Sequence, residues 1–167
     1  MATNLSHPVL MKAQVLPAFK KPYELHEVPL LTHTSPHDLR IKVNAASYCH
    51  TDAVLAEGLM PPIPSTFPHI SCHEFAGTVV ALPSFTPDSG ATPHSFKIGD
   101  RVGIPGRAFH PCGKCVECSF PPSKANPEKD PAGYSVFCPS AGNYGISRVG
   151  GFAEYAVVDS RQVAPIP

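Results

Sequence analysis

The chain has 167 residues, of which 43% are hydrophobic, and its 13 basic and 13 acidic side chains give a formal net charge of zero. This length and composition allow a buried core and exclude a disordered composition. The absence of a basic block argues against nucleic-acid or anionic-membrane binding. The N-terminal residues do not resemble a secretory signal, and no segment approaches the roughly 18 apolar residues of a transmembrane helix. We therefore expect a soluble, cytoplasmic protein.

Proline and glycine, with 21 and 12 residues, occur so often that long helices are excluded over most of the chain. The apolar segments between them are short and rich in Val, Ile and aromatic residues, which predicts strands. In chain order, the predicted strands are 12–16, 23–31, 38–48, 74–82, 100–104 and 150–158. The sequence therefore predicts a mainly β protein, either a barrel or a sandwich.

One segment, HTDAVLAEG at 50–58, differs from this pattern and predicts a short helix. Thr51 or Asp52 is the expected N-cap, and Gly58 is the expected stop. Two segments rich in Pro, Ser and Lys, 83–95 and 121–133, are expected to be surface loops.

Three cysteines recur every three residues in CGKCVEC, and nineteen residues separate the last of them from a fourth. In a reducing cytosol, clustered cysteines are more often metal ligands than disulfides. Four thiolates form a closed, tetrahedral structural zinc site, which does no chemistry. Gly113 eases the tight turn within the first pair. The predicted ligands are Cys112, Cys115, Cys118 and Cys138; disulfides and unrelated buried cysteines are the alternatives.

The two remaining cysteines, Cys49 and Cys72, each directly precede a histidine. A thiolate and an imidazole from separate segments could bind a second zinc that is left open for a substrate. Asp52 could then hold a ligand imidazole through its other ring nitrogen, and Thr51 could place a hydroxyl near the reacting oxygen. From spacing alone, the two Cys-His pairs could equally be packed core residues.

Six motifs follow one another along the chain: MKAQVL at 11–16, CHTD at 49–52, HEFAGTVV at 73–80, GDRV at 99–102, CGKCVEC at 112–118 and GGFAEYAVV at 150–158. In this order they resemble the N-terminal, GroES-like catalytic domain of zinc-dependent alcohol dehydrogenases, in the medium-chain dehydrogenase/reductase superfamily. The resemblance implies a mainly β fold: a GroES-like, partly open β-barrel with short helices and a zinc-stapled loop lobe. It also implies that 1–167 form one domain, with the lobe at about 110–140.

The resemblance implies two zinc sites. Cys49 and His73 would bind a catalytic zinc, and Glu74 would be an adjacent carboxylate that can coordinate it transiently. The structural zinc would be bound by the four cysteines of the cluster. Glu74 could instead be a buried carboxylate that is paired elsewhere.

The resemblance also implies roles beside the catalytic zinc. Thr51 would take the proton from the alcohol, and Asp52 would hydrogen-bond His73. His50 would approach the pyrophosphate of the cofactor. As alternatives, Asp52 could be only a first-turn carboxylate favoured by the helix dipole, and His50 could be an ordinary exposed histidine.

The implied reaction is the oxidation of a small alcohol to an aldehyde or ketone, with hydride transfer to NAD or NADP. Zinc would act as a Lewis acid, and the nicotinamide would accept the hydride. The sequence supports no particular oligomeric state.

The sequence departs from the family pattern in several places. It contains no G-x-G-x-x-G fingerprint of a Rossmann domain. It also ends at VAPIP, before the expected third ligand of the catalytic zinc. We therefore expect a truncated or fragmentary dehydrogenase that is inactive alone. In addition, Cys72 replaces the usual glycine before the zinc histidine, and Val54 replaces a frequent proton-relay histidine. The segment before Cys138 is longer than usual, which a zinc site tolerates because loop-closure cost grows slowly with length.

Two other functions compete with this interpretation. One is a stand-alone, zinc-stabilised β module without catalysis. The other is a zinc-free quinone or enoyl reductase of the same superfamily, against which the cysteine cluster and the pair of Cys49 and His73 count.

Overall fold

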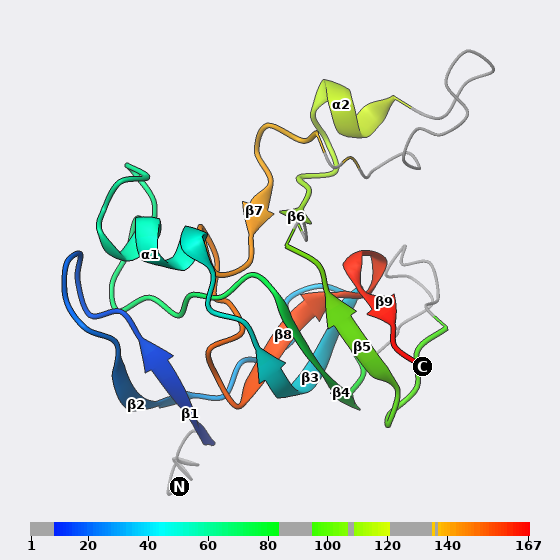
Figure 1. Ribbon diagram of the computed structural model, residues 1–167. Coiled ribbons are helices and arrows are strands. Elements are labelled where there is room, and N and C mark those ends of the chain that lie inside the picture. The colour runs from blue at the N-terminus through cyan, green and yellow to red at the C-terminus, as the bar shows by residue number, and fades with distance from the viewer. Residues whose placement is uncertain (1–8, 84–94, 107–108, 121–134, 136) are drawn as a thin grey trace, which may run out of the picture.

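The computed structural model describes residues 9–83, 95–106, 109–120, 135 and 137–167. Over these residues the protein consists mainly of antiparallel β-strands, with two short α-helices and a short 3-10 helix (Figure 1). The prediction of a mainly β protein is therefore confirmed. The predicted surface loops, 83–95 and 121–133, lie almost entirely outside the described residues.

The largest element is a five-stranded antiparallel sheet with the strand order β8-β3-β4-β5-β9. Its strands are β3 (Asp38–Ala46), β4 (Phe75–Ala81), β5 (Arg101–Ile104), β8 (Tyr155–Asp159) and β9 (Ala164–Pro165). In the register of β3, Leu39 lies opposite Val158, and Ala46 lies opposite Phe75. Because β8 and β9 are the two edges, the sheet is open over the described residues.

A second, two-stranded sheet contains the N-terminal strands β1 (Leu10–Val15) and β2 (Glu24–Pro29). Alternate residues of β1 are buried, as expected for a strand with one face on a core. Single bridges connect Ala13 to Ala153 and Leu16 to His69. These bridges connect β1 to the segment before β8 and to the loop before β4.

The main core consists of inward-facing residues of the five-stranded sheet and of the loops at one end of it. Full burial of one such aliphatic side chain stabilises the fold by about 1.5–3 kcal/mol. The buried members of this cluster are Leu39, Ile41, Cys72, Phe75, Val79, Val102, Ile104, Tyr144, Ala156 and Val158.

All six predicted strands are present, but the last begins later than predicted. Residues 150–152 are not part of β8, because their amides donate to carbonyls of the loop before β4. These bonds run from Gly150 to Ile70, from Gly151 to Cys72 and from Phe152 to Ser71. Sequence reasoning missed β6 (Phe109–His110), β7 (Gly142–Asn143), β9, α2 (Val116–Ser119) and η2 (Ser160–Gln162), which are too short to show a periodic pattern.

The predicted short helix is present as α1 (His50–Ala56), but the predicted N-cap was wrong. Cys49 is the N-cap: its backbone is extended, and its Sγ accepts the amide of Thr51 at 3.2 Å. Asp52 lies at the third helical position and accepts the amide of Cys49 at 3.0 Å. The start of α1 is therefore a capping box with a thiol in the place of the usual hydroxyl.

The predicted stop of this helix is confirmed. Gly58 follows the C-cap Glu57 and has φ +73°, a conformation that glycine adopts at little cost. Its amide donates to the carbonyl of Leu55 at 2.9 Å, and the amide of Leu59 donates to Val54 at 3.1 Å. This pair of bonds is a Schellman motif.

Candidate metal centres

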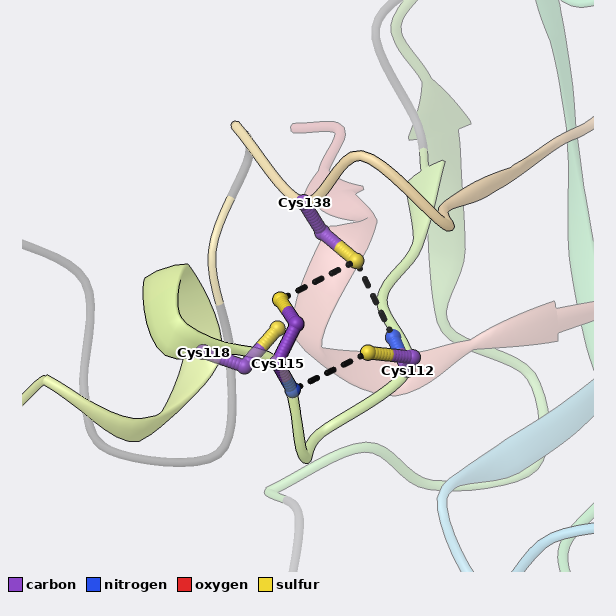
Figure 2. A group of neighbouring side chains, drawn as sticks. All are labelled: Cys112, Cys115, Cys118 and Cys138. Carbon is purple, nitrogen blue, oxygen red and sulfur yellow. Dashed lines mark hydrogen bonds between the residues drawn. The ribbon is translucent and has the colours of Figure 1, made fainter.

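The four-cysteine cluster lies in a lobe at one end of the molecule, beyond the short ladder formed by β6 and β7 (Figure 1). Cys112 and Cys115 precede α2, Cys118 lies within it, and Cys138 comes from the segment that leads to β7. Figure 2 shows the four sulfur atoms turned toward one another. All four lie within 4.8 Å of one another.

Backbone amides of the lobe point at these sulfur atoms. The amide of Cys115 donates to Cys112 Sγ at 3.3 Å, and the amide of Cys112 donates to Cys138 Sγ at 3.4 Å. The amides of Lys114 and Cys115 lower the pKa of Cys112 to about 6, because they favour its thiolate. Burial raises the pKa of the Cys118 thiol to about 12. The lobe thus stabilises negative charge on one sulfur before any metal binds, and the thiolate is the form that binds metal.

The spacing of the sulfur atoms fits one tetrahedral ion. Zinc–sulfur bonds of about 2.3 Å at tetrahedral angles place two sulfurs about 3.8 Å apart. The Sγ atoms of Cys115 and Cys138 are 3.9 Å apart. All six cysteines of the chain are free thiols in the structure, which argues against the disulfide alternative. The cluster therefore has the donors and the spacing of a closed structural metal site.

A second group of candidate ligands forms where β3 ends and β4 begins. Because Ala46 lies opposite Phe75, antiparallel pairing places the residues after β3 beside those before β4. Cys49 Sγ and His73 Nε2 consequently lie 3.8 Å apart, although 24 positions separate them in the sequence. A carboxylate oxygen of Asp52 lies within 4.8 Å of Cys49 Sγ and of a ring nitrogen of His73. The pairing of these two strands thus assembles a mixed sulfur, nitrogen and oxygen group.

Asp52 holds this group together through the backbone. Its two carboxylate oxygens accept the amide of Cys49 at 3.0 Å and the amide of Cys72 at 2.9 Å. The expected hydrogen bond between Asp52 and His73 is not made, because both oxygens face these amides. Among the described residues, Nδ1 of His73 is buried and has no hydrogen-bond partner.

The other expected site residues lie around this group. Thr51 is partly buried, with its amide on Cys49 Sγ, and His50 is exposed at the first position of α1. Glu74 is exposed, so the alternative of a buried, paired carboxylate was wrong. Glu74 lies close to Gly106: a Cβ on that glycine would lie 2.7 Å from Glu74 Oε1 and 3.0 Å from Cδ2 of His73. Sequence reasoning did not single out Gly106, because only the folded chain brings the end of β5 to His73.

Cys72 belongs to the core and not to the ligand group. Its side chain is fully buried, and its thiol faces the carbonyl oxygens of Glu74 at 3.2 Å and Ser47 at 3.6 Å. Burial raises the pKa of this thiol to about 11. Its φ is +78°, a conformation that favours glycine. This backbone gives a physical reason for the glycine that the family usually has before the zinc histidine.

Two glycines, Gly145 and Gly150, pack on the backbone of Cys72. A Cβ on Gly145, which has φ +68°, would lie 2.3 Å from the carbonyl of Cys72. A Cβ on Gly150 would lie 2.2 Å from the same carbonyl oxygen and 2.3 Å from that of Ser71. The segment that carries His73 is thus fixed by two contacts that leave no room for a side chain.

Two cavities lie on another part of the molecule, around residues 147–149. One has a volume of about 230 Å³ and includes Tyr144 and Val157 in its lining; the other, of about 420 Å³, is lined mostly by apolar side chains such as Met11 and Ile70. Leu31, Arg148 and Val149 line both. Neither of these two cavities is lined by Cys49, Asp52 or His73.

A family model for the alcohol dehydrogenase GroES-like domain matches residues 35–167. The chain belongs to this family. An alcohol dehydrogenase from Geobacillus stearothermophilus is 36% identical over 159 residues, which are 94% of this chain and 40% of that protein. An alcohol dehydrogenase from Rhizobium meliloti (strain 1021) is 34% identical over 157 residues, with the same coverage. A cobalt- and zinc-bound thermostable alcohol dehydrogenase from Pyrobaculum aerophilum has a similar structure, with a TM-score of 0.69 and 26% identity over 94% of this chain and 41% of that one.

The resemblance deduced from the six motifs is thus confirmed for this alcohol dehydrogenase GroES-like domain. The domain spans about 40% of the length of the curated relatives named above. Among the described residues, none of the helices is both long and apolar enough to cross a membrane.

Proposed function

We propose that this chain is the catalytic domain of a zinc-dependent alcohol dehydrogenase, which oxidises an alcohol to an aldehyde or ketone with NAD(P) as the hydride acceptor. The proposal rests on one observation above all. The fold places the thiol of Cys49 and the imidazole of His73 3.8 Å apart from separate segments, beside the carboxylate of Asp52. We also propose that residues 1–167 form a single domain, with the structural-zinc lobe at about 110–140.

The donors at both centres fit zinc. At the first centre, four thiols with a sulfur–sulfur distance of 3.9 Å match a closed tetrahedral site. At the second, zinc–sulfur and zinc–nitrogen bonds of about 2.3 and 2.0 Å would place the two donor atoms about 3.5 Å apart, against the observed 3.8 Å. Cys49 and His73 are only partly buried, so a substrate can reach the metal position.

When bound by Cys49 and His73, zinc would supply Lewis acidity to the alcohol oxygen. The hydroxyl of Thr51, two residues after Cys49, would accept the proton that the alcohol loses. Asp52 would keep the two ligand segments in place through its bonds to backbone amides. Glu74 would supply a carboxylate at the exposed side of His73, and the exposed His50 would meet the cofactor pyrophosphate.

The nicotinamide would be held by a separate nucleotide-binding domain. The nicotinamide would supply the hydride acceptor, and the protein would contribute position and electrostatics. The substrate would be a small alcohol or the matching carbonyl compound. The competing hypothesis, a zinc-stabilised β module without catalysis, predicts zinc binding without turnover in any context.

A domain exchange tests the proposal. Residues 1–167 would replace the matching 40% of the Geobacillus stearothermophilus enzyme, and NAD(P)H formation would be followed by absorbance with a panel of alcohols. We expect zinc-dependent turnover that is abolished by Cys49→Ala and kept by Lys97→Ala, an exposed residue near β5. A chimera that is folded, zinc-loaded and able to bind nucleotide, yet has no turnover on the panel, would leave the module as the better description.

A further inference from the structure

Two ligand segments make up the second metal centre: Cys49 with α1, and the loop before β4 that contains His73. The connection between β1 and β2 is hydrogen-bonded to both of them. The amide of Leu16 donates to the carbonyl of His69 at 2.7 Å, and the amide of His69 donates back to Leu16 at 2.9 Å. The amide of Lys20 donates to the last carbonyl of α1 at 2.7 Å. The N-terminal hairpin therefore lies against both ligand segments (Figure 1).

Tyr23 ends this connection, directly before β2, and its hydroxyl reaches the loop that contains His73. The hydroxyl donates to Oγ of Ser71 at 2.9 Å. Ser71 is fully buried and lies two positions before His73. Burial raises the pKa of Tyr23 above its ordinary value, so the hydroxyl stays protonated at neutral pH and can act as this donor. The hydrogen bond thus ties the N-terminal hairpin to one ligand segment.

The ring of Tyr23 reaches the other ligand segment through a cluster of three aromatic side chains. It meets Tyr48 edge-on at a centroid distance of 6.4 Å and Phe152 edge-on at 5.8 Å, and Tyr48 stacks on Phe152 at 6.2 Å. Rings in these arrangements attract one another. Tyr48 directly precedes Cys49, and the amide of Phe152 donates to the carbonyl of Ser71 at 3.2 Å. The cluster thus holds the residue before Cys49 against the backbone of Ser71.

We propose that Tyr23 is a positioning residue of the second metal centre, which sets the separation of Cys49 and His73 by holding both of their segments. The proposal rests on the proposed function where it concerns bound metal, because the metal is the same. The two ligands are 24 positions apart in the sequence, so their spacing depends on the contacts that link their segments. Asp52 links the segments by accepting the amides of Cys49 and Cys72, and Tyr23 links them from the hairpin.

Cobalt titration of the full chain tests the proposal, because Co²⁺ takes the place of zinc and its visible absorption reports the geometry of the donor atoms. Tyr23→Phe keeps the ring and removes the hydroxyl, whereas Tyr23→Leu removes both. Tyr144→Phe is the matched control. It removes a buried tyrosine hydroxyl whose hydrogen-bond partner, the amide of Asp159 at 2.7 Å, belongs to neither ligand segment.

We expect two bound equivalents in the wild type, one with the spectrum of a four-thiolate site and one with the spectrum of a single thiolate. Tyr23→Leu should lower the affinity of the second equivalent by about 10–100-fold, the range typical of a neighbour that orients ligands. Tyr23→Phe should lower it by about 2–10-fold, the equivalent of one hydrogen bond. Both variants should shift the visible bands of this equivalent, and Tyr144→Phe should leave its affinity and bands unchanged.

Urea unfolding of the metal-free chain is measured in parallel, because a residue that only packs also affects stability. The proposal requires that the Tyr23 variants change the second equivalent beyond what Tyr144→Phe does at a similar loss of stability. If they lose stability but bind the second equivalent with wild-type affinity and bands, Tyr23 only packs and the proposal is wrong. The proposed function would then stand.

A metal-free measurement separates the proposal from the proposed function. Nuclear Overhauser contacts between the β-protons of Cys49 and the ring protons of His73 report the proximity of the two side chains. We expect these contacts in the wild type and Tyr144→Phe, and weaker contacts in Tyr23→Leu. If the wild type binds only the four-thiolate equivalent, the proposed catalytic zinc is wrong, and unchanged contacts in Tyr23→Leu would overturn the positioning role as well. Where Tyr23→Leu does not fold, wild-type affinity, bands and contacts in Tyr23→Phe overturn the proposal.

Discussion

The two candidate metal centres are built in different ways. In the lobe, Cys112, Cys115 and Cys118 come from seven consecutive residues, and local amides point at their sulfurs. At the second centre, Cys49 and His73 come from segments that meet only because β3 pairs with β4. The lobe centre therefore depends on local backbone and on its metal, whereas the second centre depends on the sheet and on the contacts around Cys72. Changes at one centre should leave the other intact.

The largest effect is expected from removal of a lobe ligand. Cys112→Ser should lower the zinc affinity of the lobe by more than about 100-fold, because a ligand matters more than the partners that orient it. Mass spectrometry should find one zinc fewer per chain, and limited proteolysis should cut the segment between Cys118 and Cys138 faster. Because the two centres share no ligand residue, we expect the second one to keep its metal. Loss of both metals from this variant would show that the two centres are coupled.

The second prediction concerns a substitution that packs against the segment before His73 and replaces no candidate metal ligand. Gly150→Ala should lower the free energy of unfolding by about 3 kcal/mol, because its Cβ would press on the carbonyl oxygens of Cys72 and Ser71. Urea unfolding of the zinc-loaded chain measures this loss. Gly99→Ala is the matched control: its φ is +98° but nothing lies within 4 Å of the added Cβ, so strain alone should cost about 1 kcal/mol. Equal losses in the two variants would contradict the packing argument.

The third prediction concerns the backbone that precedes His73. Cys72→Gly and Cys72→Ala both remove the buried sulfur, so their difference isolates the cost of φ +78°. The glycine variant should be about 1 kcal/mol more stable than the alanine variant, as measured by urea unfolding. At Ala76 in β4, replacement by glycine should instead destabilise the chain by about 0.5–1 kcal/mol. If the alanine variant were more stable than the glycine variant at position 72 as well as at position 76, the backbone of residue 72 would not be strained by a left-handed conformation in solution.

The smallest expected effect is a pH dependence of the free energy of unfolding, caused by the buried His69 near the second centre. Burial lowers the pKa of His69, against the opposing effects of the Gly145 carbonyl bond and the charge of Asp52. The folded state therefore disfavours protonation of His69, so its contribution to stability is present above the ordinary pKa of about 6.5 and is lost as pH falls through it. Unfolding of the wild type and His69→Gln between pH 7.5 and about 5 measures the difference. A slope that is as steep in the variant as in the wild type would assign the pH dependence to other groups.

Much of the fold could be predicted because strands leave a local pattern. The segments 38–48 and 74–82 are short, apolar and rich in Val, Ile and aromatic residues, and they contain β3 and β4. The Gly58 stop of α1 was likewise predictable from one residue type. The N-cap was not, because the choice among Cys49, Thr51 and Asp52 depends on which side chain finds an amide. The two-residue strands β6, β7 and β9 are defined by their partners alone.

The candidate site divides in the same way. The four cysteines of the lobe and the CHTD and HEFAGTVV motifs could be read from spacing and order, because metal ligands in short loops and family motifs are local features. The hydrogen-bond partners of Asp52 could not be predicted in this way, and the predicted bond from Asp52 to His73 was not found. The proximity of Gly106 to His73 and of Gly150 to Cys72 was equally hidden. Apart from the bond between Asp52 and Cys49, which spans three positions, these contacts join residues 20 or more positions apart.

The sequence by itself determined the mainly β character, the short helix after Cys49 and the two sets of candidate ligands. Each of these depends on neighbours within a few positions: strand periodicity, glycine and proline breaks, or cysteine spacing. Only the tertiary structure decided that Asp52 ties Cys49 to Cys72, that Cys72 is a core thiol, and that glycines close the space around it. The reason is physical: a carboxylate, a thiol or a missing Cβ has no preferred partner until antiparallel pairing brings distant backbone groups within hydrogen-bonding distance.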